Sequence, residues 1–337
     1  MAARTRCQEG RPRPLREIRP VGSGMDGMRM PVDPPTLLTL FTPQIDVTSI
    51  FPALALLALA VYLVGVRSLH RRGLRWPRHR TVAFALGIVT VLLVTATQVM
   101  GYGMMIFSIH MLQKMVLAVL SSMLIMLGAP VSLAIRTLPR RGPAAVWRTL
   151  LVLGMRSRTA KVLAHPVVST TLFVGSLYGF YFTPAFDLLM SHWVGSLLML
   201  AFFLFTGLLA FGGAFGLDPW PHRVSAPIRL VELVVPGPLH AFFAVAVMMA
   251  STPLVQSFVH APASWGVDVM TDQLAAGNIV WGFGELPTIV AVAIVFWQWV
   301  RSDERRAQAG DKRADLELEA YNAQLARLAA GQRRTMG

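Results

Sequence analysis

Five ionisable side chains lie inside apolar stretches of this sequence, where an ionised group is costly and often serves a function. His110 and Lys114 share one stretch, Glu232 and His240 share another, and Glu285 lies in the last. A spacing of four residues places His110 and Lys114 on the same face of a helix. These five residues are therefore the first candidates for a functional site.

A soft metal ion is one ligand that such side chains can hold. Met248 and Met249 follow His240 toward the end of its stretch, and Cys7 is the only cysteine. Histidine nitrogen and methionine sulfur both bind Cu(I). The sequence thus permits a copper site made of His110, His240, Met248 and Met249. The alternative is that the methionines fill apolar space and the histidines only hydrogen-bond neighbouring helices.

Lys114 opposes a metal ion on its own helix face, because an ammonium is positively charged and has no lone pair. At this depth it needs a partner, and we expect Glu232 or Glu285 to form an ion pair with it. Glu285 lies in the stretch Gly284–Pro287. A proline inside a helix kinks it and frees backbone carbonyls.

The elements that must position these residues are apolar segments near twenty residues long. Hydrophobic residues make up 54 % of the 337 residues and charged residues only 14 %, against roughly 25 % charged in soluble domains. The sequence predicts an all-α fold, a polytopic membrane protein with a bundle of seven transmembrane helices. The predicted spans are 48–66, 82–101, 104–128, 164–185, 193–216, 227–250 and 274–300.

Basic residues indicate the orientation of this bundle. The loops after the first, third and fifth spans and the C-terminal tail hold most of the 31 Lys and Arg, whereas the alternate loops hold none. The positive-inside rule then places the N-terminus outside and the C-terminus in the cytoplasm. The net charge of +14 is therefore a topology signal. We expect contact with membrane lipid and no nucleic-acid partner.

The spans divide the chain into three parts. Residues 1–47 are Arg- and Pro-rich and are predicted to be disordered, 48–300 form the transmembrane domain, and 301–337 form a cytoplasmic tail with a helix at 311–330. Arginines near the N-terminus conflict with an outside position. We therefore expect translation to start at Met25, Met28 or Met30.

Several short motifs, in order, resemble one family. They are Phe107–Met115, Gly128–Pro130, Gly216–Pro219, Pro238–Phe243, Gly284–Pro287 and Gln298–Glu304. The series is similar to the cytochrome c oxidase assembly factors of the CtaG type, seven-span bacterial membrane proteins, and the last motif resembles their actinobacterial branch. The resemblance covers about residues 45–330.

The resemblance implies a place in the bacterial cell membrane and an accessory role in the respiratory chain. Its implied partners are haem-copper oxidase subunits, and its implied task is to aid copper delivery to the oxidase. His110 and His240 match the family's pattern. Lys114, Ser196 and Phe202 stand where the family often has histidine, which implies either a reduced copper site or a metal-free member.

The residues contain no complete acid–base or nucleophile set, so we expect no enzyme activity. Two other classes remain open. A small-solute or ion transporter or channel would use Lys114, Glu232 and Glu285 along a polar path. A metal-free structural subunit of a membrane complex would use the same charges as interhelical pairs.

Overall fold

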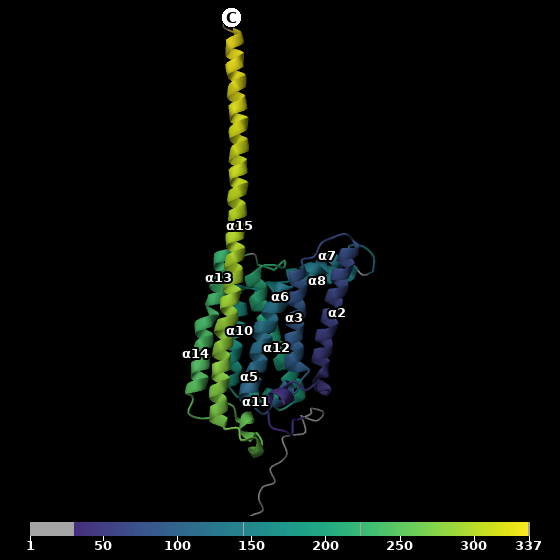
Figure 1. The fold of residues 1–337 in the computed structure, drawn as a ribbon, viewed down its shortest axis with the longest axis vertical. Helices are drawn as coiled ribbons and strands as arrows, with labels where there is room; N and C mark the ends of the chain where they lie inside the picture. Colours follow the sequence, from purple (N-terminus) through teal and green to yellow (C-terminus); the bar gives the residue numbers. More distant parts are fainter. Residues whose placement is uncertain (1–29, 144, 223, 336–337) are drawn as a thin grey trace, which may run out of the picture.

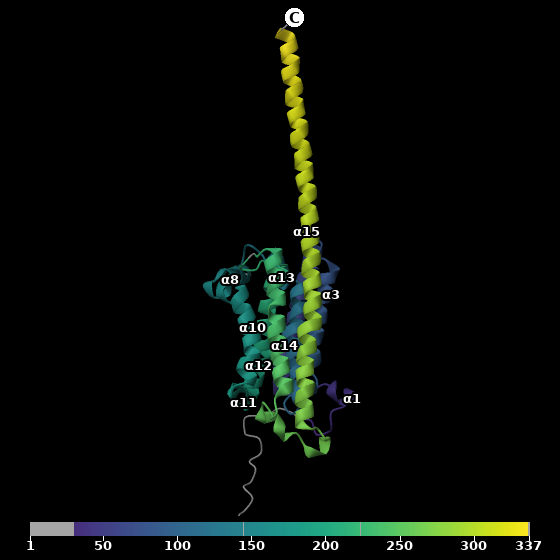
Figure 2. The same cartoon turned by 90° about the vertical axis from the view of Figure 1, so that its left-hand side faces the viewer.

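Long apolar helices run up and down beside one another and form the body of the molecule (Figures 1 and 2). The computed structural model describes residues 30–143, 145–222 and 224–335. Within these residues there is no β-strand, and six helices are long and apolar enough to cross a membrane. Those six are Val47–Arg71, Arg78–Thr95, Phe107–Thr137, Trp193–Phe215, Ala226–Met249 and Val269–Gln324. The predicted all-α polytopic bundle is confirmed.

Two of the six join separate α-helices, and Val47–Arg71 adds the 3₁₀ turn Val47–Ser49 to α2. One consists of α5 (Phe107–Met115), a π-helical stretch (Val116–Ser121), α6 (Ser122–Leu127) and α7 (Pro130–Thr137). The other joins α13 (Ala226–Val234) to α14 (Pro236–Met249). The remaining four contain α2 (Ile50–Arg71), α3 (Arg78–Thr95), α12 (Trp193–Phe215) and α15 (Val269–Thr335).

The break between α6 and α7 follows from three consecutive residues. Ala129 has a positive φ of 50°, and Pro130 has no N–H to continue the helix. Gly128 lies so close to α3 that a Cβ there would stand 2.6 Å from Phe84 Cβ. Its carbonyl accepts a hydrogen bond from the Tyr62 hydroxyl at 2.8 Å. The close approach and the left-handed residue thus fix the turn into α7.

The predicted span at 164–185 corresponds to α10 (Pro166–Tyr181), which packs against α12 and α14 inside the bundle. Its 16 residues give a length of about 24 Å, less than the roughly 30 Å of a hydrocarbon core. As a seventh span it stays a prediction. Shorter helices flank the bundle: α1 (Leu37–Leu40), α4 (Val99–Tyr102), α8 (Ala145–Arg156), α9 (Arg158–Leu163), α11 (Ala185–Met190) and the 3₁₀ turns Val47–Ser49, Gln256–His260 and Ala263–Trp265.

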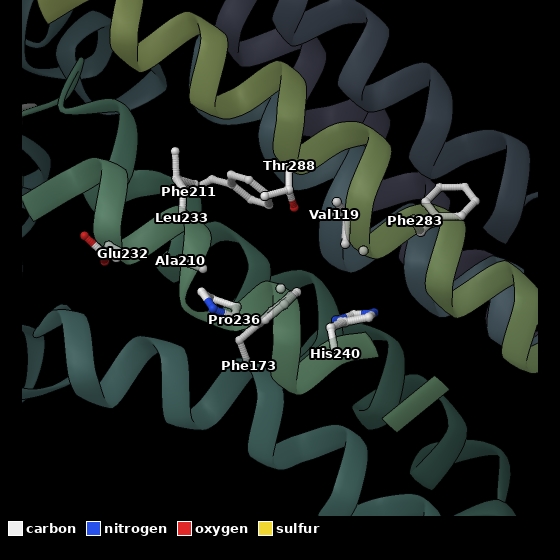
Figure 3. A pocket seen from close by; sticks show the side chains of 12 residues that line it. Val119, Phe173, Ala210, Phe211, Glu232, Leu233, Pro236, His240, Phe283 and Thr288 are labelled. Carbon is white, nitrogen blue, oxygen red and sulfur yellow. The ribbon is translucent and has the colours of Figure 1, made fainter. Parts of the chain in front are cut away.

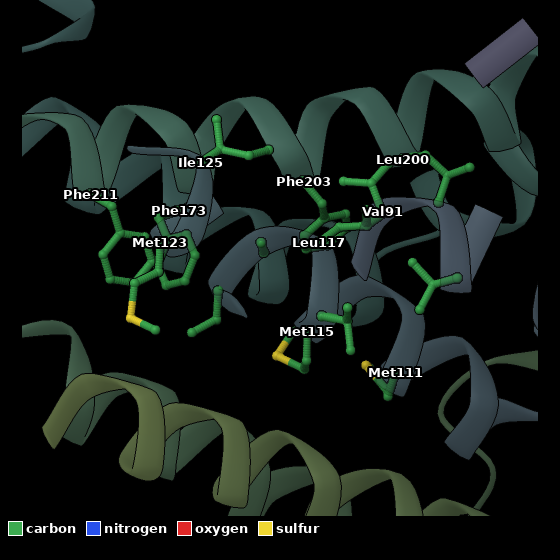
Figure 4. Packing of buried hydrophobic residues seen from close by; sticks show 14 of the residues in the cluster. Val91, Met111, Met115, Leu117, Met123, Ile125, Phe173, Leu200, Phe203 and Phe211 are labelled. Carbon is green, nitrogen blue, oxygen red and sulfur yellow. The ribbon is translucent and has the colours of Figure 1, made fainter. Parts of the chain in front are cut away.

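The apolar side chains face both inward and outward. Met111, Met115, Leu117 and Phe203 are fully buried between α5, α12 and the π-helical stretch (Figure 4). Large apolar side chains such as those of Leu57 on α2 are exposed on the outer surface. Extended apolar surface of this kind marks contact with lipid or protein.

The loops rich in arginine all lie at one end of the bundle. The α2–α3 connection, α7, α8, the start of α13 and the C-terminal part of α15 share that end, which we call the basic end (Figure 1). The opposite end carries α1 and α11 (Figure 2). The grouping on which the predicted topology rests is therefore present in the fold.

Two of the predicted domain boundaries are corrected. Residues 30–47 are not disordered: they contain α1, the Gln44 N–H donates to Ala96 O at 2.9 Å, and the Tyr102 hydroxyl donates to Asp33 O at 2.9 Å. Residues 1–29, with Met25 and Met28, lie outside the described residues. The helix predicted at 311–330 is not separate, because α15 continues from residue 269 to 335 through Pro287.

Candidate polar sites inside the bundle

His110 is fully buried at the start of α5, and both of its ring nitrogens are engaged. Nδ1 lies 2.9 Å from Gly103 O, and Nε2 lies 2.9 Å from the Tyr181 hydroxyl. A carbonyl only accepts hydrogen bonds, so Nδ1 donates and Nε2 accepts from tyrosine. Phe186 and Phe258 meet the imidazole edge-on, with ring centroids at 5.2 and 5.3 Å. No lone pair of His110 is therefore free for a metal ion.

Lys114 is also fully buried, one turn further along α5. Its Nζ donates to Gln113 Oε1 at 2.9 Å. The Gln113 amide in turn donates to Val94 O on α3 at 2.7 Å and to Met100 Sδ at 3.2 Å. Sequence reasoning missed Gln113, although its polar side chain beside Lys114 in an apolar stretch was the available signal.

The two candidate carboxylates have other partners than Lys114. Glu285 is exposed on α15 and accepts from Trp281 Nε1 at 2.9 Å. Glu232 is buried, accepts a long hydrogen bond of 3.5 Å from the Ser169 hydroxyl, and lies near Arg229. Within the part of the chain that the structure describes, no ion pair joins Lys114 to either one. The predicted pairing is thus not formed, because Glu285 faces outward and Glu232 is held at the basic end.

His240 lies on α14 against a small cavity in the middle of the bundle (Figure 3). The cavity holds about 30 Å³ and is lined mainly by apolar side chains from α10, α12, α14 and α15. His240 is buried, and its Nε2 has no hydrogen-bond partner. A Cβ on Gly284 would stand 2.9 Å from His240 Cδ2, so a glycine is needed where α15 crosses the imidazole.

The four predicted copper ligands do not come together around one point. Met248 packs against Gly277, where a Cβ would stand 2.4 Å from its Cγ, and Met249 is 79 % exposed. Neither methionine lines the cavity at His240. Among residues 30–143, 145–222 and 224–335, no three His, Cys, Asp or Glu side chains cluster as metal ligands do. Together with the engaged nitrogens of His110, this arrangement does not fit a copper site of the predicted composition.

Ser196 and Phe202, which stand where the family often has histidine, make only packing and weak polar contacts. The Ser196 hydroxyl donates to Met104 Sδ at 3.4 Å. The Phe202 ring meets Phe180 edge-on with centroids 5.4 Å apart. Neither residue supplies a ligand in place of the missing imidazole.

Two aspartates outside the predicted site hold helix ends in place. Asp272 at the start of α15 accepts from the Phe107 and Ser108 N–H groups at 2.7 and 3.3 Å. Asp218, in the loop after α12, accepts from Ser132 N–H at 2.6 Å at the start of α7. Helix N-termini have unpaired N–H groups and a positive partial charge, so a carboxylate stabilises them. Each aspartate therefore clamps a helix that is far away in the sequence.

The Asp218 side chain is buried in the loop after α12, outside the spans. Burial raises the pKa of Asp218 above its usual value, while its hydrogen bonds with Ser132 and Val131 act in the opposite direction. Next to Asp272, the Gln273 amide accepts from Leu254 N–H at 2.9 Å and donates to Val247 O at 3.2 Å. These side chains tie the loops at both ends of the bundle to the helices.

The fold and these clamps define a polytopic α-helical membrane protein whose polar residues mostly hold helices together. Residues 60–302 match the family of the cytochrome c oxidase caa3 assembly factor (Caa3_CtaG), and the chain belongs to that family. The resemblance predicted from the motifs is thereby confirmed.

Mycobacterial proteins are similar over most of this chain. Uncharacterized proteins of Mycobacterium bovis and Mycobacterium tuberculosis are each 36 % identical over 315 residues, which is 90 % of this chain, and one of Mycobacterium leprae is 35 % identical over 316 residues. The chain spans 47 % of the length of these relatives. No solved structure matches it.

Proposed function

We propose that this chain is an accessory factor for cytochrome c oxidase assembly in the bacterial cell membrane, with its basic end and C-terminus in the cytoplasm. The observation that carries the proposal is the family match over residues 60–302, which begins within α2, ends within α15 and includes the four spans between them. The grouped basic loops support the orientation through the positive-inside rule. The proposed partners are haem-copper oxidase subunits in the same membrane.

The role that the geometry favours is that of a scaffold without catalytic activity. His110 and Lys114 are held by neutral hydrogen-bond partners, and the aspartates cap helices. These contacts stabilise the bundle and leave neither His110 nor Lys114 free to act on a substrate. Copper delivery through His110 and His240 has no support from their surroundings, so the proposal assigns no step to copper.

A deletion strain tests this function. The strain should lose assembled oxidase, measured as oxidase subunits, haem and copper in purified membranes. A copy with the parent sequence should restore all three, and so should a copy with His240→Ala, because the proposed role does not need that imidazole as a ligand. Normal oxidase in the deletion strain would refute the assembly role.

The same strain separates a scaffold from a copper carrier. Loss of a scaffold should lower the amount of oxidase subunits, whereas loss of a copper carrier leaves subunits with haem but without copper. Added copper should not restore oxidase in the deletion strain. If added copper alone restored oxidase in the deletion strain, the scaffold role would be refuted in favour of copper delivery. The accumulated amount of each variant, followed by an epitope tag, controls for misfolding.

A further inference from the structure

Buried polar atoms without hydrogen-bond partners lead from the basic end of the bundle toward its centre. Among the described residues they include Arg229 Nε, Trp220 Nε1, Glu232 Oε2 and His240 Nε2. A buried polar atom left unpaired costs roughly 1–3 kcal/mol. Buried polar atoms in native proteins are nearly always paired with protein or ordered water. Four such atoms in succession therefore indicate a common partner, and water is the simplest one that meets both donors and acceptors.

The first part of this succession lies in an open cavity at the basic end. It holds about 510 Å³ between α7, the end of α12 and α13. Its charged and titratable lining residues are Arg136, Asp218, His222 and Arg229. The Trp220 indole and Gly213 form part of its wall. A cavity of this size and polarity is filled by solvent.

Gly213 connects this open cavity to Glu232. A Cβ on Gly213 would stand 3.3 Å from Trp220 Nε1 and 3.2 Å from Glu232 Oε1. The indole and the carboxylate therefore both lie against the bare backbone of α12. Arg229, which donates from Nη1 to Phe215 O at 3.1 Å, and Ser169 are the other polar side chains beside Glu232. Glu232 thus lies at the inner limit of the open cavity.

Glu232 also lines the small cavity that His240 faces (Figure 3). The volume of about 30 Å³ exceeds the 10–15 Å³ that a single water needs by this measure. Thr288 on α15 lines the same space. The Glu232 and His240 side chains are eight residues apart, which is roughly 12 Å along a helix. The two side chains are therefore too far apart to hydrogen-bond each other directly, whereas water in the cavity can hydrogen-bond to each of them.

Beyond His240 the bundle is closed by apolar and aromatic side chains. Phe243, Ala244 and Val247 on α14 are fully buried. Phe243 packs against Tyr181, with ring centroids 5.9 Å apart, and Tyr181 is held by His110. This packing leaves His240 connected to the basic end and separated from the opposite end.

We propose that the chain contains a one-sided, water-filled route from its basic end to His240, in which Glu232 separates an outer cavity from an inner one. The ligand of this site is water, and through water the Glu232 carboxyl and the His240 imidazole exchange protons with the aqueous phase of one side only. The proposal is independent of the role in oxidase assembly.

Cysteine accessibility tests the route. Cys7 is the only cysteine, so Cys7→Ala gives a cysteine-free chain. Single cysteines are then placed in the inner cavity, as Thr288→Cys or as Gly237→Cys, where a Cβ meets no atom within 4 Å. The matched controls are Leu286→Cys and Ile289→Cys on the same helix, which are 70 % and 63 % exposed on the outer surface. The silver ion, small enough for the cavity, is added to one side of sealed vesicles that contain the chain in a known orientation.

The thiolate, and not the thiol, is the reactive form. A thiol in water therefore reacts, while one in lipid stays protonated. We expect both cavity cysteines to react with silver at least about tenfold faster than the controls, and only from the basic end. Replacing the polar residue between the cavities, as Glu232→Leu, should slow the Thr288→Cys reaction by about the same factor. Equal rates for cavity and control positions, or faster reaction from the opposite end, would overturn the proposal, and an unchanged rate with Glu232→Leu would remove Glu232 from the route.

A second measurement uses the unaltered chain and so does not depend on the folding of variants. Hydroxyl radicals made from bound water by an X-ray pulse oxidise the side chains next to that water. Phe173 and Phe283, which line the inner cavity, should be oxidised, whereas Phe243 beyond His240 should not. Oxidation of Phe243 alone, or of none of the three, would contradict a hydrated cavity at His240.

Discussion

The stability of Lys114→Met distinguishes a buried ion pair from the neutral hydrogen bond that the structure shows. The side chain is fully buried and its ammonium donates to the neutral oxygen of Gln113. Removing a lysine charge from the centre of a membrane helix relieves about 2.5–3.5 kcal/mol on insertion scales. Losing a hydrogen bond with one charged partner costs about 1.5–3 kcal/mol. The net change in the free energy of unfolding for Lys114→Met therefore lies between about 0.5 kcal/mol of destabilisation and about 2 kcal/mol of stabilisation.

A buried ion pair would behave differently. Removing one partner of such a pair destabilises a protein by about 3–5 kcal/mol, because the other charge is left buried and unpaired. The assay is reversible unfolding of the purified chain in mixed micelles of rising SDS fraction, followed by circular dichroism. We expect Lys114→Met to unfold at or slightly above the parent's midpoint. Combining it with Glu232→Gln or Glu285→Gln should give a coupling free energy below about 0.5 kcal/mol.

Gln113→Met is the matched control, since it removes the same hydrogen bond from the other side. It leaves the Lys114 ammonium without its partner and also removes the bond to Val94 O. It should therefore destabilise the chain more than Lys114→Met does. A loss of 3 kcal/mol or more in Lys114→Met, recovered when a carboxylate is neutralised, would refute this reasoning and restore the ion pair.

Four further outcomes are expected. Asp272→Ala should lower the free energy of unfolding by about 0.5–2 kcal/mol, because α5 loses its cap; an unchanged midpoint in the same assay would deny Asp272 that role. Because burial raises the pKa of Asp218 in the folded chain, stability should fall as pH rises from about 4, the pKa of an unfolded aspartate, and unfolding midpoints of Asp218→Asn measured across pH should lack this decline. Tyr181→Phe leaves a buried imidazole nitrogen without a partner and should cost about 1–3 kcal/mol in unfolding, more than Tyr178→Phe, whose hydroxyl bonds near the surface; equal losses would count against the buried hydrogen bond. A reporter fused to the C-terminus should be active only in the cytoplasm, and activity outside would reverse the proposed orientation.

Hydropathy and charge in the sequence were sufficient for the fold class and for the grouping of the basic loops, because both depend on solvent and not on particular contacts. The helix faces were harder. α15 does pack against α5, and its polar contact with that helix is made by Asp272 near its start. Glu285 comes 13 residues later, about 220° around a helix of 3.6 residues per turn. That rotation, which follows from the spacing in the sequence, turns Glu285 away from Lys114.

The surroundings of the candidate copper ligands were hidden from the sequence for a related reason. Residue type showed that His110 and His240 can bind copper, but only tertiary contacts reveal that Tyr181 engages one imidazole and that the other faces a small cavity. The order of residues 30–47 likewise comes from hydrogen bonds with α4 and with the end of α3, which no local pattern predicts. A sequence pattern does not show which residues, far apart in the chain, contact each other in the fold.

α15 is one continuous helix, so a small tilt inside the bundle displaces its far end by a larger distance. The helix runs for 67 residues from Val269, past the cavity-lining Gly284, to Thr335 beyond the basic end (Figure 2). The part from residue 301 onward is about 50 Å long at 1.5 Å per residue. A tilt of about 5° where α15 crosses His240 at Gly284, about 75 Å from the far end at 1.5 Å per residue, displaces that end by about 7 Å. A movement too small to break a hydrogen bond inside the bundle is thus enlarged outside it to more than the roughly 5.4 Å pitch of a helix.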